Sequence, residues 1–181
     1  NAQDGTLWIA TLAGVDRYNG VGFIEYRPNL PDSRHIPSAD ILNILETKYG
    51  DIFVATADSG LFAFNEEIDR FEKINWRNTK YIPIGRVSAA YSDRDGDIWV
   101  GYESGAVARF SPDSKTVKSI AINTIHRITG FSESALGTIF TATSKGEIFE
   151  LERNTSSSKE IKLTRSCSDK FSELDEIAVA E

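Results

Sequence analysis

Apolar and polar positions along this chain form short runs that recur at a regular distance. Four apolar runs of five residues, LWIAT, IFVAT, IWVGY and IFTAT, each begin two residues after a glycine, and these four glycines are 41 to 46 residues apart. Runs of this length, rich in β-branched and aromatic residues and bounded by turn residues, are typical of β-strands. A repeat of about 40 to 50 residues that contains several short strands is typical of β-propeller blades.

The second repeat shows how one such unit is built. It contains four runs separated by turn residues, at 40–47, 52–56, 61–64 and 71–74. Short turns between consecutive strands predict an antiparallel four-stranded sheet. The second run is apolar at nearly every position, which predicts a strand covered on both faces. The outermost run mixes apolar and charged residues, as expected at a half-solvated edge.

The repeats predict an all-β fold, a β-propeller built of four-stranded antiparallel blades, in a single propeller region over residues 1–181. The expected blades span residues 5–26, 40–74, 86–122 and 125–163, and residues 173–181 supply the first strand of a further or ring-closing blade. That last strand either completes the first blade and closes a ring or belongs to a longer propeller. We expect the four repeats to be part of a larger propeller. Small residues such as Gly101 end the second strands, which predicts close approach between blades there.

Composition excludes some classes of function. The formal net charge is −7, which argues against nucleic acid as a partner. The chain contains no apolar run near the roughly 20 residues of a membrane span, so this region is not expected to cross a bilayer itself. The single cysteine, Cys167, excludes an internal disulfide.

The repeated string resembles the two-component regulator propeller repeat, D-x-x-G-x-L-W-I-G/A-T-x-x-G-L/V-x-R-Y/F. Residues 4–18 and 95–110 match it, with Tyr102 in the place of the threonine, whereas Phe53 and Phe140 replace the tryptophan in the other two repeats. The resemblance implies a bacterial sensor domain in the periplasm or elsewhere outside the cytoplasm, joined to the remainder of a larger signalling protein. Because relatives in this family sense oligosaccharides, the resemblance implies an oligosaccharide as one class of ligand. Some similar propellers serve as scaffolds for surface secretion.

No motif predicts catalysis, a cofactor or a metal. The segment DRDGD at 93–97 begins like a calcium loop, but position twelve is Ser104 instead of the required glutamate. We therefore expect a turn there. His35, His126 and Cys167 are too scattered in the sequence for a typical structural zinc site. We expect no enzyme activity, although the many carboxylates leave glycoside chemistry open.

The long connection before the third repeat has no counterpart elsewhere in the chain. Trp76 and Tyr81 lie in it, together with Arg77 and Lys80. Departures from a repeat are often functional. These two aromatic residues either contact a ligand or cover the end of the core. Trp8 and Trp99 occupy the repeated position and are expected to pack between blades.

Charge divides between the two rims predicted for the propeller. The connections from an outer strand to the next first strand hold eight arginines and lysines against three acidic residues, whereas the first-to-second-strand turns are mostly acidic. A basic rim would steer an anionic ligand. The expected ligand-binding residues are Trp76, Arg77, Lys80, Tyr81, Arg86, Arg34, His35 and Arg127. They predict a non-catalytic domain that senses a carbohydrate or another small ligand, anionic ligands included. We expect such a domain to signal through a change in how propellers pack or form a homodimer. The alternative is a scaffold for protein interactions.

Overall fold

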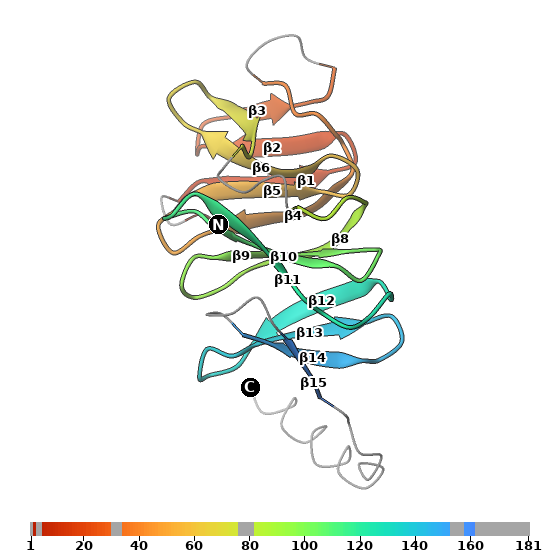
Figure 1. Ribbon diagram of the computed structural model, residues 1–181. Coiled ribbons are helices and arrows are strands. Elements are labelled where there is room, and N and C mark those ends of the chain that lie inside the picture. Colours follow the sequence, from red (N-terminus) through yellow and green to blue (C-terminus); the bar gives the residue numbers. More distant parts are fainter. Residues whose placement is uncertain (1, 3–4, 30–33, 76–81, 153–157, 162–181) are drawn as a thin grey trace, which may run out of the picture.

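The computed structural model describes residues 2, 5–29, 34–75, 82–152 and 158–161. These residues form four separate antiparallel sheets and no helix. The sheets are stacked face to face in a row, in the order of the sequence (Figure 1). We call them blades 1 to 4, and the expected all-β architecture is confirmed.

Each blade is a meander in which consecutive strands pair. Blade 1 contains β1 (Leu7–Thr11), β2 (Gly14–Tyr18) and β3 (Phe23–Tyr26), which correspond to the second, third and fourth strands of the other blades. Blade 2 contains β4 (Ile41–Glu46), β5 (Ile52–Thr56), β6 (Gly60–Asn65) and β7 (Arg70–Lys73). Blade 3 contains β8 (Val87–Ser92), β9 (Ile98–Tyr102), β10 (Val107–Ser111) and β11 (Thr116–Ile120). Blade 4 contains β12 (Ile128–Glu133), β13 (Ile139–Thr143), β14 (Ile148–Leu151) and β15 (Ser158–Ile161).

The first strands of neighbouring blades lie against one another. β4 contacts β8, and β8 contacts β12, so these three strands form the inner edge of the stack. In all three, the pairing with the second strand shifts register near the start, between Ile41 and Asn43 in blade 2, for example. The sequence did not predict this irregularity. The expected strand at 173–181 lies outside the described residues.

One turn repeats before every second strand, β1 included. Gly5, Gly50, Gly96 and Gly137 all adopt φ between 83° and 86°. In each turn the glycine N–H donates to the carbonyl three residues earlier, as Gly96 does to Asp93. Because glycine adopts positive φ without steric cost, these glycines fix the tight connection between the first two strands.

The described residues form three apolar clusters, one between each pair of neighbouring blades. All five residues of β5 and all five of β9 are buried, which confirms that these second strands are covered on both faces. Trp99 is fully buried and packs in the cluster that includes blade 4, as expected for the repeated tryptophan. Trp8 is half-buried between blades 1 and 2.

At Gly101, blade 3 lies in close contact with blade 4, with no side chain on the glycine to separate them. A Cβ atom built on Gly101 would lie 2.6 Å from Cβ of Ile128 in β12 and closer still to its Cγ2. Only hydrogen fits in this space. The predicted close approach at the end of a second strand is therefore confirmed for blades 3 and 4.

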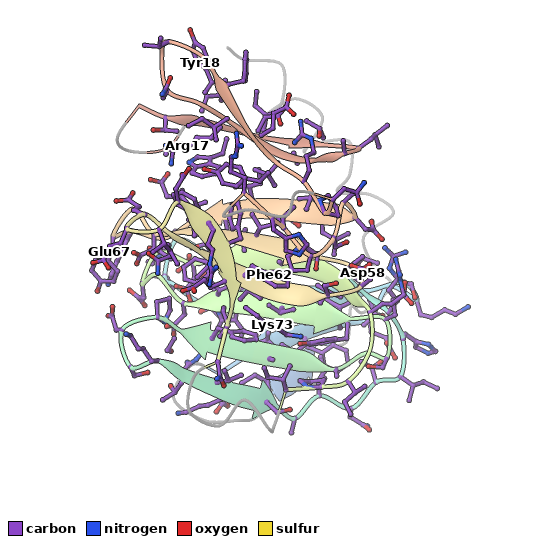
Figure 2. All side chains as sticks on the ribbon, turned by 90° about the horizontal axis from the view of Figure 1, so that it is seen from above. Arg17, Tyr18, Asp58, Phe62, Glu67 and Lys73 are labelled. Atoms are coloured by element: carbon purple, nitrogen blue, oxygen red, sulfur yellow. The ribbon has the colours of Figure 1, made fainter. Side chains whose placement is uncertain are left out.

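The strand order divides the turns between two rims. The turn rim carries the first-to-second and third-to-fourth-strand turns, and the connection rim carries the second-to-third-strand turns and the connections between blades. Figure 2 shows Arg17 and Glu67 toward one end of the sheets and Asp58 at the opposite end. Glu67 thus marks the turn rim, and Asp58 marks the connection rim.

Candidate functional site

The predicted ligand-binding residues fall into two groups. Trp76, Arg77, Lys80 and Tyr81 lie outside the described residues. Arg34, His35, Arg86 and Arg127 are exposed on the connection rim. They come from three successive connections, one between each pair of blades, and their role in binding stays a prediction.

Arg86 already has partners of opposite charge. Its guanidinium lies 2.8 Å from a carboxylate oxygen of Asp40 and 3.7 Å from one of Glu103. Glu103, Asp58 and Glu147 belong to second-to-third-strand turns, which also reach this rim. The sequence count left these turns out. The described part of the connection rim therefore carries charges of both signs, and not a uniformly basic field.

A cavity of about 700 Å³ opens between blades 2 and 3 on this rim. Blade 2 contributes residues 58–61 and 73–75, the connection contributes 82–85, and blade 3 contributes Val87, Val100, Tyr102 and Phe110. Most of its described lining residues are apolar, and those with polar side chains are Asp58, Ser59, Lys73, Asn75 and Tyr102. Binding sites for small molecules commonly combine an apolar wall with a few placed polar groups.

The unrepeated connection borders this cavity. Asn75 and Ile82, the described residues on either side of the predicted segment 76–81, both line it. Ile84 is almost fully exposed, at 98%, so an apolar side chain stands in solvent at the edge of the cavity. The described residues at both ends of the unrepeated connection therefore lie at this cavity.

Tyr102 is the functional candidate that the sequence reasoning missed. In the other blades, the same strand position holds Thr11, Thr56 or Thr143, whose hydroxyls hydrogen-bond within the following turn. Tyr102 instead extends its ring into the apolar cluster between blades 2 and 3 and lines the cavity. Its replacement of the repeated threonine was the signal in the sequence.

The Tyr102 hydroxyl has no partner among the described residues. The residue is only 3% exposed, and its backbone pairs with Ala106 and Gly105, but no described group hydrogen-bonds the side chain. Burial raises the pKa of Tyr102, so the hydroxyl stays protonated. Tyr102 therefore offers the cavity a neutral hydrogen-bond donor beside apolar residues.

Asp58 supplies a fixed negative charge to the same cavity. A hydrogen bond from the buried Ser38 holds the pKa of Asp58 below its usual range, so this carboxylate is ionised at neutral pH. Lys73 lines another part of the cavity wall and carries the opposite charge.

A second cavity, of about 600 Å³, lies between blades 1 and 2 on the turn rim. Trp8, Arg17 and Phe64 line it, and the Arg17 guanidinium lies 5.6 Å and 5.4 Å from the centres of the two rings. Arg17 also pairs with Asp69 at 3.2 Å, and Tyr26 donates to the same carboxylate oxygen at 2.7 Å. The cation here holds two blades together.

The segment DRDGD forms a turn, as expected. One oxygen of the buried Asp93 accepts hydrogen bonds from the backbone N–H groups of Asp95 and Asp97, and the other accepts one from Trp99 Nε1 at 2.8 Å. The described residues contain no group of three or more histidine, cysteine, aspartate or glutamate side chains placed to hold a metal ion. Within the same part of the chain, no helix is long and apolar enough to cross a membrane.

Comparison with known proteins identifies this arrangement through structure rather than sequence. No protein-family model and no curated protein matches the chain. The structure is similar to the extracellular domain assigned to the hybrid two component system BT4673 from B. thetaiotaomicron, with a TM-score of 0.71 and 19% identity, over 91% of this chain and 22% of that one.

Two further structures share the arrangement. Virginiamycin B lyase from Staphylococcus aureus is similar with a TM-score of 0.66 and 16% identity, over 91% of this chain and 54% of the lyase. The WD40 β-propeller domain of Doa1 is similar with a TM-score of 0.58 and 12% identity, over 84% of this chain and 48% of that domain.

These likenesses show the fold. The four sheets are β-propeller blades, and the predicted resemblance to propellers of two-component regulators is confirmed at the level of the fold. The chain spans about a fifth of the length of the BT4673 domain and about half of the lyase.

Proposed function

We propose that this chain is part of a larger propeller in the extracytoplasmic sensory region of a bacterial signalling protein. The likeness to the BT4673 extracellular domain supports this proposal, as does the fraction of that domain that the chain spans. The ligand is a small molecule, with carbohydrates and anionic compounds among the candidates.

The observation that carries the proposal is the cavity between blades 2 and 3. It lies where the unrepeated connection meets the rim, and it combines an apolar wall with Asp58, Lys73 and Tyr102. A ligand bound there contacts two blades at once. Binding therefore favours one relative arrangement of the blades, and a population shift of this kind can be passed to neighbouring domains or across a homodimer.

We propose a non-catalytic role for the cavity. A general acid or base works best with a pKa near the operating pH. The pKa of Asp58 is lowered and that of Tyr102 is raised, so each shifts away from neutrality. The likeness to a lyase lies in the fold, and fold does not determine function.

Two matched variants test the site. Ile84 and Ile125 are 98% and 82% exposed, lie in equivalent connections between blades, and differ in that Ile84 lines the cavity. Binding of a panel of neutral oligosaccharides, acidic oligosaccharides and small amphipathic compounds is measured by ligand-observed NMR. We expect Ile84→Asp to weaken binding at least about tenfold and Ile125→Asp to leave it unchanged. Failure of every panel member to bind, or equal effects of both variants, would overturn the proposal.

The alternative function is a protein-interaction scaffold. Exposed aliphatic residues on the connection rim support it, namely Leu12, Ile84 and Ile125. Isolated exposed apolar residues are normal, and contiguous patches mark interfaces. If the rim binds a protein, Ile125→Asp weakens complex formation with the rest of the parent protein as strongly as Ile84→Asp does.

A further inference from the structure

The departure of Tyr102 from the repeat is informative because the three threonines have a shared structural task. Thr56 Oγ1 donates to the Gly60 carbonyl at 2.9 Å and accepts from the Ser59 N–H at 3.1 Å. Thr11 and Thr143 make similar bonds in their own turns. Tyr102 gives up these contacts in blade 3, so its side chain is not there to hold the turn.

Packing of the Tyr102 ring does not explain why the residue carries a hydroxyl group. Packing between blades 2 and 3 is apolar around it, with Leu61, Val100 and Phe110 among the neighbours that also line the cavity. A phenylalanine would supply the same ring. The Tyr102 hydroxyl is not among the fully buried polar atoms that lack a partner in the described part of the chain, so it reaches the space of the cavity, where water or a ligand can bond it. The described residues provide no protein group that hydrogen-bonds it.

We propose that Tyr102 is a specificity-determining residue whose hydroxyl donates a hydrogen bond to an acceptor on the ligand. The inference rests on the proposed function, since it concerns the same cavity. It names the ligand class: a compact molecule with an apolar ring or chain that fits the aliphatic wall, and a carbonyl or ether oxygen that meets the hydroxyl. Lys73 and Asp58 lie in the wall to receive polar substituents.

The donor role follows from the protonation state and the surroundings. A phenol is neutral at physiological pH and burial raises the pKa of Tyr102 further, so its hydroxyl has a proton to donate. A site built to hydrogen-bond a ligand rejects an analogue that lacks the partner atom, because the buried polar group is then left unpaired. The cavity therefore distinguishes two ligands of the same shape by one oxygen atom.

A pair of probes tests this inference. Para-fluoroacetophenone and para-fluoroethylbenzene have similar shapes, and only the ketone carries a hydrogen-bond acceptor. Their binding to the full chain is measured by fluorine NMR. We expect the wild-type protein to prefer the ketone by about three- to tenfold, the range of one neutral hydrogen bond. Tyr102→Phe should remove this preference while it still binds the hydrocarbon, which also reports that the cavity remains intact.

A control and two contrary outcomes complete the design. Tyr18→Phe removes a hydroxyl in blade 1 that donates to the Gly20 carbonyl, and it should leave the preference unchanged. If both probes bind but Tyr102→Phe keeps the preference, the role of Tyr102 is wrong and the cavity remains a binding site. If neither probe binds the wild-type protein, the cavity does not take this ligand class, and the inference fails. A panel compound whose binding is weakened by Ile84→Asp would then still support the proposed function.

Discussion

Gly101→Ala tests the packing of blades 3 and 4 with a single methyl group. The new Cβ would lie 2.6 Å from Cβ of Ile128 and 3.1 Å from its Cγ1, so one strand must shift. Overpacking of a well-packed core typically costs about 1–3 kcal/mol. Replacement of a strand glycine by alanine returns about 0.5–1 kcal/mol through reduced backbone entropy. We expect the free energy of unfolding to fall by up to about 2.5 kcal/mol, the difference between these two terms.

Gly130→Ala is the matched control. Gly130 is also a strand glycine, in β12, and a Cβ built on it meets nothing within 4 Å. This variant should be as stable as the wild-type protein or slightly more stable. The assay is equilibrium unfolding in urea followed by tryptophan fluorescence. Equal or higher stability of Gly101→Ala relative to Gly130→Ala would refute the close contact between the blades.

Three other changes probe the links between elements. Arg94→Met removes an ion pair of 2.6 Å to the buried Glu133 of the next blade, and we expect a loss of about 1–3 kcal/mol in urea unfolding; an unchanged midpoint would show that the pair is not stabilising. Ser38→Ala should raise the pKa of Asp58, measured by NMR titration of its carboxyl carbon. Because the folded-state pKa of Asp58 is lowered, the stability that Asp58 contributes is complete above its unfolded-state pKa and is lost as pH falls through its folded-state pKa. Ser38→Ala should therefore weaken the dependence of the unfolding free energy on pH in this range. An unchanged pKa of Asp58 in the variant would contradict the hydrogen bond. Phe149→Ala empties a fully buried site between blades 3 and 4 and should cost about 3–5 kcal/mol in thermal or urea unfolding, whereas a loss below 1 kcal/mol would argue against tight packing there.

The sequence predicted the features that repeat. The all-β fold, the buried second strands of blades 2 and 3 and the turn at DRDGD follow from local patterns that recur along the chain, whereas β1 in blade 1 is only partly buried. Gly101 also belongs to this group, because a small residue ends each second strand. Local signals of this kind are strong because propensity, turn chemistry and burial agree.

The sequence could not place the features that depend on neighbouring blades. The cavity lies between two repeats, so no single repeat contains its wall. The pairing of Arg86 with Asp40 joins residues 46 positions apart, and the count of charges along connections missed it. Tyr102 stood out as a mismatch in the motif, but only the packing of blades 2 and 3 shows that its hydroxyl reaches a cavity without a partner.

The most direct test of the binding site is a map of backbone amide shifts on addition of the tightest-binding compound of the panel. If the ligand binds between blades 2 and 3, the largest shifts in the nitrogen–proton NMR spectrum fall at Ser59–Leu61, Ile84–Val87 and Tyr102. Shifts centred on Trp8 and Arg17, at the cavity of the turn rim, or spread evenly over the chain would contradict the account.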